Sequence, residues 1–319
     1  MSPTGISFAA LDPALLLPPL IAGWLVLATH VPLGRRVLAR GIIFLDLAVA
    51  QLAVLGVIAA HALNLAPEGW PTQLAAAMAA LAGAALLAFC ERRWPEIQEA
   101  LIGSTFVVAA SLGVLLLTGD PHGGEHLSEL LTGQILWVGT AQIAQIAALY
   151  AGLIAFWWLR GSRLGSLGFY LIFALAITAS VQLVGVYLVF ASLILPALAV
   201  RGWPSRSGLL AGWMLGALAY AGGLIASALF DLPAGPAIVI ALALVALTSS
   251  LVIAASLNQD NLEETTATVT RLREGTKMEQ ATGWFKRSTD RIEFQPIGDS
   301  TKFVVLENLA LERIAAELE

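Results

Sequence analysis

The stretch GIIFLDLAVAQLAVLGVIAAHA, from Gly41 to Ala62, is almost entirely apolar and contains a single carboxylate, Asp46. About 20 apolar residues, each adding about 1.5 Å, span the hydrocarbon core of a bilayer. A carboxylate inside such a crossing costs about 2.5–3.5 kcal/mol, so it usually faces other helices or a transport path. The stretch therefore predicts a membrane helix that turns a buried acid toward the interior of a bundle.

Asp46 shares one stripe of this predicted helix with small residues, Ala50, Ala53, Val57 and Ala60. Gln51 lies about 140° round the helix from Asp46, and His61 lies about 22 Å further along its axis. We expect Asp46 and His61 to contact a transported ion, and Gln51 to reach the same ion as Asp46 if the helix is locally rewound or a second copy contributes. The alternatives are a structural hydrogen bond for Asp46 and an interfacial histidine for His61.

The composition of the whole chain agrees with a membrane protein. Of 319 residues, 58% are hydrophobic and only 12% are charged, and the mean hydropathy is +0.81. No ordinary water-soluble domain has such a surface, so we expect a polytopic protein in a lipid bilayer. The single cysteine, Cys90, excludes an internal disulfide framework. A net charge of −5 argues against nucleic acid as a partner.

Hydrophobic stretches of crossing length lie at 13–31, 42–63, 72–90, 100–118, 136–159, 208–229 and 236–256. The segment 168–200 is too long for one upright helix and too short for two full crossings with a loop. We expect two short helices there, joined near Gln182 and Gly185. The predicted fold is therefore an all-α membrane domain with about nine crossings, or eight if this segment crosses once.

Charges predict the orientation of these crossings. Before residue 258 every basic residue is an arginine, in four clusters: Arg35, Arg36 and Arg40; Arg92 and Arg93; Arg160 and Arg163; Arg201 and Arg206. The loops between them are acidic and contain Glu68, Asp120, Glu125, Glu129 and Asp231. The positive-inside rule places arginine loops in the cytoplasm. We therefore expect the N-terminus outside and the C-terminus inside, and take the membrane to be a bacterial cytoplasmic (inner) membrane.

The composition changes after Leu257, and all three lysines of the protein lie beyond this point. We expect a transmembrane domain at 1–257 and a small cytoplasmic α+β tail at 258–319. The tail is predicted to contain a helix around 261–282, the strands RIEFQPI and KFVVLE joined by the turn GDS, and a closing helix LALERIAAELE. Because it is too small for a substantial core, we expect it to dock on a second copy or on a partner.

No catalytic or nucleotide-binding motif is present in the sequence. It contains no GxxxxGK[ST], no strand–turn–helix with GxGxxG, and no HExxH, GxSxG or SxxK. The chain is therefore not expected to be an enzyme or to hold a covalent cofactor. If it moves a solute by ATP hydrolysis, a separate chain must supply the ATPase.

The outer loop PHGGEHLSELLTGQILW contains two histidines and two acids in helical spacing, His122, Glu125, His126 and Glu129. If the segment is helical, these residues share one face. Imidazole and carboxylate groups bind zinc, iron and manganese. We therefore consider a metal-capture site, with a solvated loop as the alternative. Glu99, at the start of the crossing 100–118, is expected to be an acid placed favourably at a helix N-terminus.

Four segments resemble the permease subunit of the zinc/manganese/iron ABC importers: VQLVGVYLVFASLILPALAV, EALIGSTFVVAASLGVLLL, LLTGQILWV and LPAGPAIVIALAL. The family's second crossing carries G-D-A-x-S-H-A, whose aspartate and histidine bind the metal. The resemblance assigns the aspartate role to Asp46, whereas the histidine is replaced and Gln51 is the nearest polar residue. The chain is thus divergent, and its C-terminal tail has no counterpart in the family.

The resemblance implies a homodimer that works with two copies of a cytoplasmic ATPase and with an extracytoplasmic metal-binding protein. The implied cargo is a divalent metal, with zinc favoured over iron or manganese. Because force must arrive through cytoplasmic loops, we expect the ATPase to contact Arg201, Trp203 and Arg206, and also Arg163. Two other functions stay open from the sequence: a secondary transporter driven by an ion gradient, and a membrane anchor for the tail.

Overall fold

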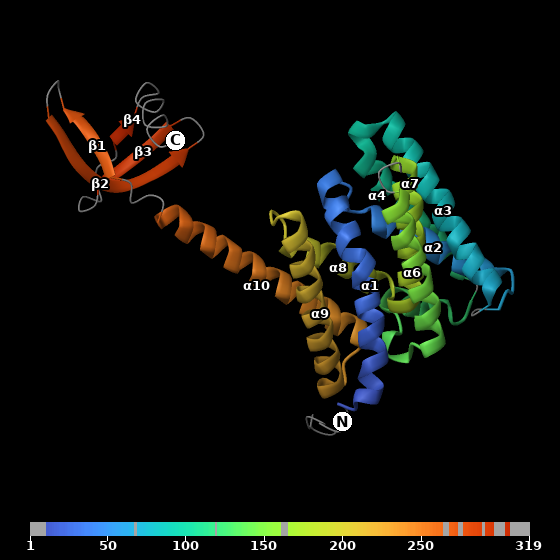
Figure 1. The fold of residues 1–319 in the computed structure, drawn as a ribbon. Coiled ribbons are helices and arrows are strands. Elements are labelled where there is room, and N and C mark those ends of the chain that lie inside the picture. Colours follow the sequence, from blue (N-terminus) through green and yellow to red (C-terminus); the bar gives the residue numbers. More distant parts are fainter. Residues whose placement is uncertain are drawn as a thin grey trace. The chain divides into compact units, whose positions relative to one another are not determined.

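The computed structural model describes the chain except residues 1–10, 67–68, 119, 161–164, 264–267, 274–276, 289–290, 297–303 and 307–319. The chain divides into two compact units, Met1–Ser249 and Ser250–Glu319. The first unit is helical and the second contains the strands (Figure 1).

The helices are α1 (Pro13–Arg40), α2 (Leu45–Ala62), α3 (Trp70–Arg93), α4 (Gln98–Leu117), α5 (Gly123–Thr132), α6 (Thr140–Arg160), α7 (Ser166–Val184), α8 (Val186–Ala199), α9 (Ser205–Phe230) and α10 (Ala234–Glu263). Short 3-10 turns, η2 (Pro95–Ile97) and η3 (Ile135–Trp137), precede α4 and α6. Within the described residues, eight helices are long and apolar enough to cross a membrane, and α8 is a shorter apolar helix. The predicted helical membrane fold is confirmed.

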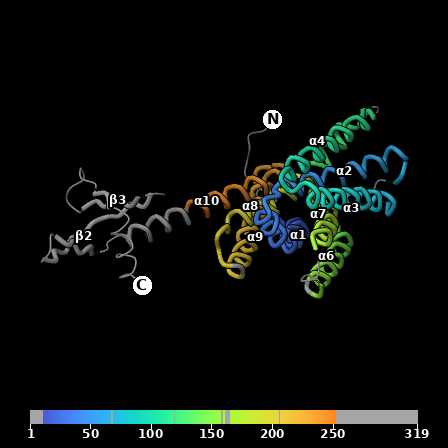
Figure 2. Tube along the Cα trace, turned by 90° about the horizontal axis from the view of Figure 1, so that it is seen from above, coloured from blue at the N-terminus to red at the C-terminus, as the bar shows by residue number. Residues whose placement is uncertain are grey.

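Helix α2 lies inside the bundle. It packs against α3, α4 and α7, whereas α1 packs against α8 and α9 and also contacts α6 and α7 (Figure 2). In the apolar part of α2, 61% of the residues are buried, compared with 17% in α6. The alanine stripe of α2 therefore faces other helices, as its sequence predicts, because small side chains let membrane helices approach closely.

A glycine contact fixes the break between α7 and α8. Gly185 (φ +80°) separates the two helices, and Gly133 (φ +72°) approaches it from the segment after α5. A Cβ atom on Gly185 would lie 2.3 Å from the Gly133 nitrogen, and one on Gly133 would lie 2.2 Å from the Val184 oxygen. Only glycine satisfies both the left-handed backbone and this distance. The predicted break near Gln182 and Gly185 is confirmed, but only α8 is short, because the 19 residues of α7 are enough to cross a membrane.

The arginine-bearing loops gather at one end of the bundle. Arg40 lies 3.9 Å from the Glu91 carboxylate, and an Arg35 N–H donates a hydrogen bond to the Trp203 carbonyl at 3.1 Å. The Arg36 guanidinium lies 3.8 Å from the centre of a Trp157 ring, a cation–π contact. We call this the arginine end. The end that holds His61, Asp120 and α5 is called the acidic end.

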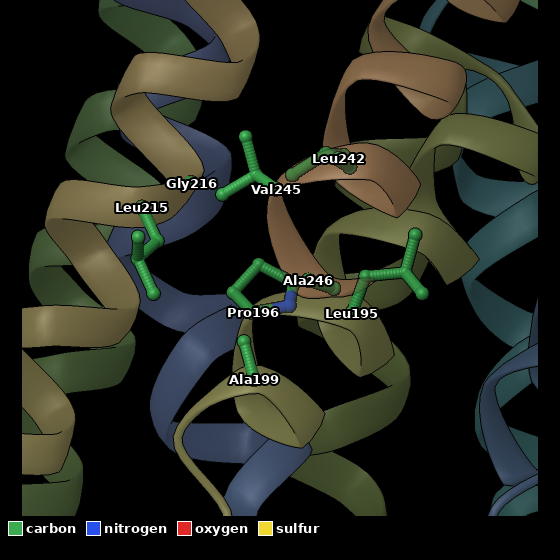
Figure 3. Close-up of a pocket in the computed structure, with 8 residues that line it drawn as sticks. All are labelled: Leu195, Pro196, Ala199, Leu215, Gly216, Leu242, Val245 and Ala246. Carbon is green, nitrogen blue, oxygen red and sulfur yellow. The ribbon is translucent and has the colours of Figure 1, made fainter. Parts of the chain in front are cut away.

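Figure 3 shows a shallow pocket between α8, α9 and α10, lined by Leu195, Pro196, Ala199, Leu215, Gly216, Leu242, Val245 and Ala246. None of these eight side chains is polar. A cation would lose its hydration there without gaining ligands. This pocket is therefore packing space between helices.

The second unit contains an antiparallel sheet with the strands in chain order, β1 (Thr268–Arg273), β2 (Lys277–Ser288), β3 (Arg291–Pro296) and β4 (Val304–Leu306). Strands β3 and β4 confirm the two predicted strands. The predicted helix at 261–282 is wrong, because α10 ends at Glu263 and β1 then pairs with β2 from Thr268 onward. The predicted GDS turn and closing helix lie outside the described residues.

Candidate metal sites at the two ends of helix α2

Asp46 is a buried carboxylate at the start of α2. Asp46 is 1% exposed, and neither of its carboxylate oxygens has a hydrogen-bond partner among the described residues. The predicted crossing starts at residue 42, but α1 continues to Arg40, so α2 starts only at Leu45. Asp46 therefore lies in the first turn, where the helix dipole favours a negative charge.

A buried ionised group is costly unless something compensates its charge. The compensation at Asp46 must be a proton or a cation, since no described side chain pairs with it. Gln51 is also buried, at 6% exposed. It is one and a half turns further along α2, so an amide oxygen is the next polar group of that helix after the carboxylate.

Glu99 has a positioning role at the same end. It lies in the first turn of α4, and its Oε1 accepts a hydrogen bond from the backbone N–H of Phe44 at 3.2 Å. Phe44 is the residue directly before α2. Glu99 thus joins the starts of α2 and α4, in addition to the expected favourable placement at a helix N-terminus.

His61 lies in the last turn of α2, at the acidic end. Its side chain is 43% exposed, and its Nε2 lies 3.4 Å from Oδ2 of Asp120. The ring centres of His61 and His126 are 5.2 Å apart and the rings are tilted by 56°. One ligand atom from each of His61, Asp120 and His126 lies within 4.8 Å of the others. Three metal-ligating side chains therefore converge there.

This group differs from the four outer-loop residues that the sequence singles out. Helix α5 begins at Gly123, so His122 is its N-terminal cap residue and does not share the helical face of the others. His122 and Glu125 are exposed and lie outside the group. Glu129 approaches it through His126, with 3.9 Å between its Oε2 and the Nδ1 of His126. Asp120 takes the place that the spacing gives to Glu125.

Asp120 is held in an orientation that leaves one oxygen free. Its Oδ1 accepts a hydrogen bond from the His122 backbone N–H at 2.9 Å, whereas the buried Oδ2 has no hydrogen-bond partner. The His122 N–H and, more weakly, the imidazoles of His126 and His61 lower the pKa of the Asp120 carboxyl. Asp120 is therefore ionised at neutral pH, as a metal ligand must be. From the sequence, Asp120 is predicted only as an acidic loop residue and not as a metal ligand.

The residues expected to contact an ATPase lie in the turn between α8 and α9. Arg201, Trp203 and Arg206 are all exposed, and the hydrogen bond from Arg35 to the Trp203 carbonyl attaches this turn to α1. Arg163 lies outside the described residues. Gln182 is partly buried in the last turn of α7, next to the break at Gly185.

Together, the fold and these polar groups define a multi-pass membrane protein with an unpaired carboxylate inside its helix bundle. Residues 13–164 and 162–253 match the ABC 3 transport family. Since the match covers most of the chain, the protein belongs to the ABC 3 transport family, the permeases of metal ABC importers. The matched region ends before the strands of the second unit.

Two solved structures have a similar fold. PsaBC from Streptococcus pneumoniae, solved in complex with a Fab, superposes with a TM-score of 0.60 at 22% identity, over 73% of this chain and 90% of that chain. A transporter described as the metal-chelate ABC type, in an inward-facing conformation, gives a TM-score of 0.56 at 15% identity, over 81% of this chain and 93% of that chain. The similarity extends over almost the whole length of both structures.

The resemblance drawn from the four sequence segments is therefore confirmed at the level of the family. Membership of an ABC family argues against the secondary transporter and the membrane anchor as the function of this chain. It also agrees with the prediction of a membrane subunit without catalytic motifs.

Proposed function

We propose that this chain is the permease subunit of an ABC importer that carries a divalent transition metal, with zinc preferred over iron and manganese. The observation that carries the proposal is the unpaired, buried carboxylate of Asp46. A passing cation would supply the missing charge partner, and the carboxylate would supply the cation with an oxygen ligand. A permanently paired carboxylate could not exchange ions in this way.

The preference for zinc rests on the ligands available to the cargo. The acidic end offers two imidazoles and a carboxylate, a donor set that binds zinc well. For such ligands, affinity rises from manganese through iron to zinc. Gln51, in place of a histidine, makes the inner site a weaker one, which favours release of the ion over retention.

The chain needs partners for uphill transport. We infer a separate cytoplasmic ATPase, because the sequence has no nucleotide-binding motif, and an extracytoplasmic protein that delivers the metal. The exposed turn with Arg201, Trp203 and Arg206 is the first candidate for the ATPase contact, and the loop with Arg163 is the second. Photo-crosslinkers at 203 should capture the ATPase, whereas crosslinkers at 125 should not.

We further propose that the arginine end faces the cytoplasm of a bacterium, with the N-terminus of the chain outside. The contacts at that end bring arginines of several loops together, and cytoplasmic loops are enriched in arginine. In a cysteine-free background, Arg92→Cys and Glu125→Cys should react with an impermeant thiol reagent from opposite sides. Reaction of both from one side would overturn this orientation.

Two copies of the chain are proposed to form the transporter. A single copy surrounds Asp46 with its own helices, yet helices α4 and α6 keep most of their apolar surface exposed, with only 22% and 17% of residues buried. Lipid or a second copy must cover these surfaces. The mass of the purified permease–ATPase complex would decide between one and two copies.

Reconstituted transport tests the proposed function. Proteoliposomes containing the permease, its ATPase and the metal-binding protein should accumulate Zn²⁺ only when ATP is hydrolysed, and should continue to do so when ionophores collapse ion gradients. Accumulation that stops with the gradients would identify a secondary transporter. Deletion of 258–319 should leave transport detectable, because the family match ends at residue 253. A complete loss would return the anchor function to consideration.

A further inference from the structure

We infer that His61, Asp120 and His126 form a three-ligand site for a zinc-type divalent cation at the acidic end, where the ion first binds the permease before it passes along α2. The inference deepens the proposed function and rests on it for the class of cargo. It concerns a different part of the molecule from Asp46, about 22 Å away along α2.

Distances between the ligand atoms carry the inference. In a tetrahedral zinc site with bonds of about 2.1 Å, neighbouring ligand atoms lie about 3.4 Å apart. The His61 Nε2 and Asp120 Oδ2 atoms are 3.4 Å apart, and all three ligand atoms lie within 4.8 Å of one another. The third ligand atom, from His126, therefore needs to approach the other two by no more than about 1.4 Å to complete the three-ligand arrangement.

The unpaired oxygen of Asp120 indicates a position for a bound cation. Oδ2 is buried and has no hydrogen-bond partner among the described residues, while the His122 N–H holds Oδ1 and so fixes the carboxylate plane. His61 Nε2 faces that oxygen at a distance longer than a good hydrogen bond, 3.4 Å. An ion between the two groups would satisfy both, whereas the direct pair satisfies neither fully.

Glu129 supplies the outer support that metal-binding histidines usually have. Its Oε2 lies 3.9 Å from the Nδ1 of His126, one turn away on α5. A carboxylate beside one ring nitrogen favours a proton there and directs the other nitrogen to the metal. His126 would therefore bind through Nε2, the same atom that His61 presents to Asp120.

Exposure of the ligands indicates capture rather than permanent binding. The side chains of His61 and His126 are 43% and 46% exposed, and three protein ligands leave a fourth position open. Structural zinc sites have four protein ligands, whereas open sites exchange their fourth ligand. The fourth position can accept water or a donor group of a delivering protein. An ion bound there also joins α2 to α5.

Metal binding to the purified full-length permease tests the site, in an Asp46→Asn background that removes the inner carboxylate. Zn²⁺ affinity is measured by competition with a chromophoric chelator, and Co²⁺ serves as a spectroscopic substitute. Loss of even an outer partner of a metal ligand typically costs about 10- to 100-fold in affinity. Asp120→Asn and His126→Gln should therefore each weaken Zn²⁺ binding at least about tenfold and remove the intense visible bands of four-coordinate Co²⁺.

Glu125→Gln is the matched control, because Glu125 neighbours His126 on α5 and lies outside the group. It should change the affinity less than about threefold. Equal Zn²⁺ binding by the parent and by both ligand variants would overturn the site and leave His61 and Asp120 as a plain ion pair. If Asp120→Asn alters the melting temperature, its loss of binding could reflect misfolding. The result of His126→Gln, at an exposed residue, then decides whether the site exists. The test measures metal binding in a background, Asp46→Asn, that is expected not to transport. Absence of the outer site would therefore leave the proposed transport function untouched.

Discussion

The two ends of helix α2 present opposite environments for a cation. At the arginine end, Asp46 is 1% exposed and has no partner for either oxygen among the described residues. At the acidic end, His61 is 43% exposed and lies beside Asp120. A buried carboxylate would hold an ion only while the ion compensates its charge, whereas an exposed group of three ligands would hold it by coordination. On the proposed function, the first environment suits passage of the ion and the second suits its capture.

Removal of the charge at Asp46 should have the largest effect. Asp46→Asn keeps the shape of the side chain but gives the cation no charge to compensate. We expect Zn²⁺ uptake to fall at least about 100-fold at all metal concentrations, which corresponds to about 2.7 kcal/mol. Uptake is measured in proteoliposomes with a radioactive isotope of zinc. Co-purification of the ATPase with the variant controls for assembly. Normal uptake at limiting metal would leave Asp46 with a structural role only.

A side chain at the glycine contact should have the next largest effect. Gly185→Ala places a Cβ atom 2.3 Å from the Gly133 nitrogen in a backbone with φ +80°. We expect the free energy of unfolding to fall by about 2–4 kcal/mol, because strain and overlap add. Thermal unfolding in detergent measures it. Gly152→Ala on α6 is the control, since an added Cβ there has open space around it, and it should leave the unfolding temperature unchanged or raised.

A ligand change at the acidic end should act on affinity alone. Asp120→Asn should raise the metal concentration for half-maximal uptake about tenfold. The maximal rate should be unchanged, because at saturating metal the ion reaches the permease without help from the capture site. Glu125→Gln should leave both values unchanged. A fall in the maximal rate with the half-saturation concentration unaltered would mean that Asp120, like Asp46, acts on passage of the ion and not on its capture.

The smallest effect is expected at Glu99, which lies close to the start of α2 but is assigned no metal contact. Glu99→Gln keeps an oxygen that can accept the hydrogen bond from Phe44 N–H and loses only the charge at the N-terminus of α4. The stability loss should be about 0.3–1 kcal/mol, and uptake should change less than about threefold. A loss comparable to that of Asp46→Asn would show that two carboxylates share the ion.

Much of the membrane unit follows from the sequence, because long apolar runs have few alternatives in a bilayer. The break at Gly185 follows as well, since its segment has the wrong length for either one or two full crossings. The start of α2 is three residues later than predicted, because hydrophobicity does not show that α1 continues through its arginines to Arg40. Cation–π and ion-pair contacts at the arginine end, which sequence cannot reveal, hold those arginines.

Two other features of the structure cannot be predicted from local sequence patterns. Asp120, in the loop before α5, contacts His61 in the last turn of α2, and no spacing rule connects residues on different elements. The strand β1 lies within the predicted helix at 261–282. Its alternation of threonine and valine is satisfied instead by pairing with β2, a choice that packing and not intrinsic preference decides.

The contact between Gly133 and Gly185 has a mechanical consequence. Helix α8 begins directly after Gly185 and ends beside the exposed turn at Arg201, and its 14 residues make a rod about 21 Å long. At one end of this rod a backbone-to-backbone contact leaves no side chain to absorb movement. A movement of this turn would therefore be passed along α8 to the segment after α5, so the loop at the acidic end would respond to movements at the arginine end.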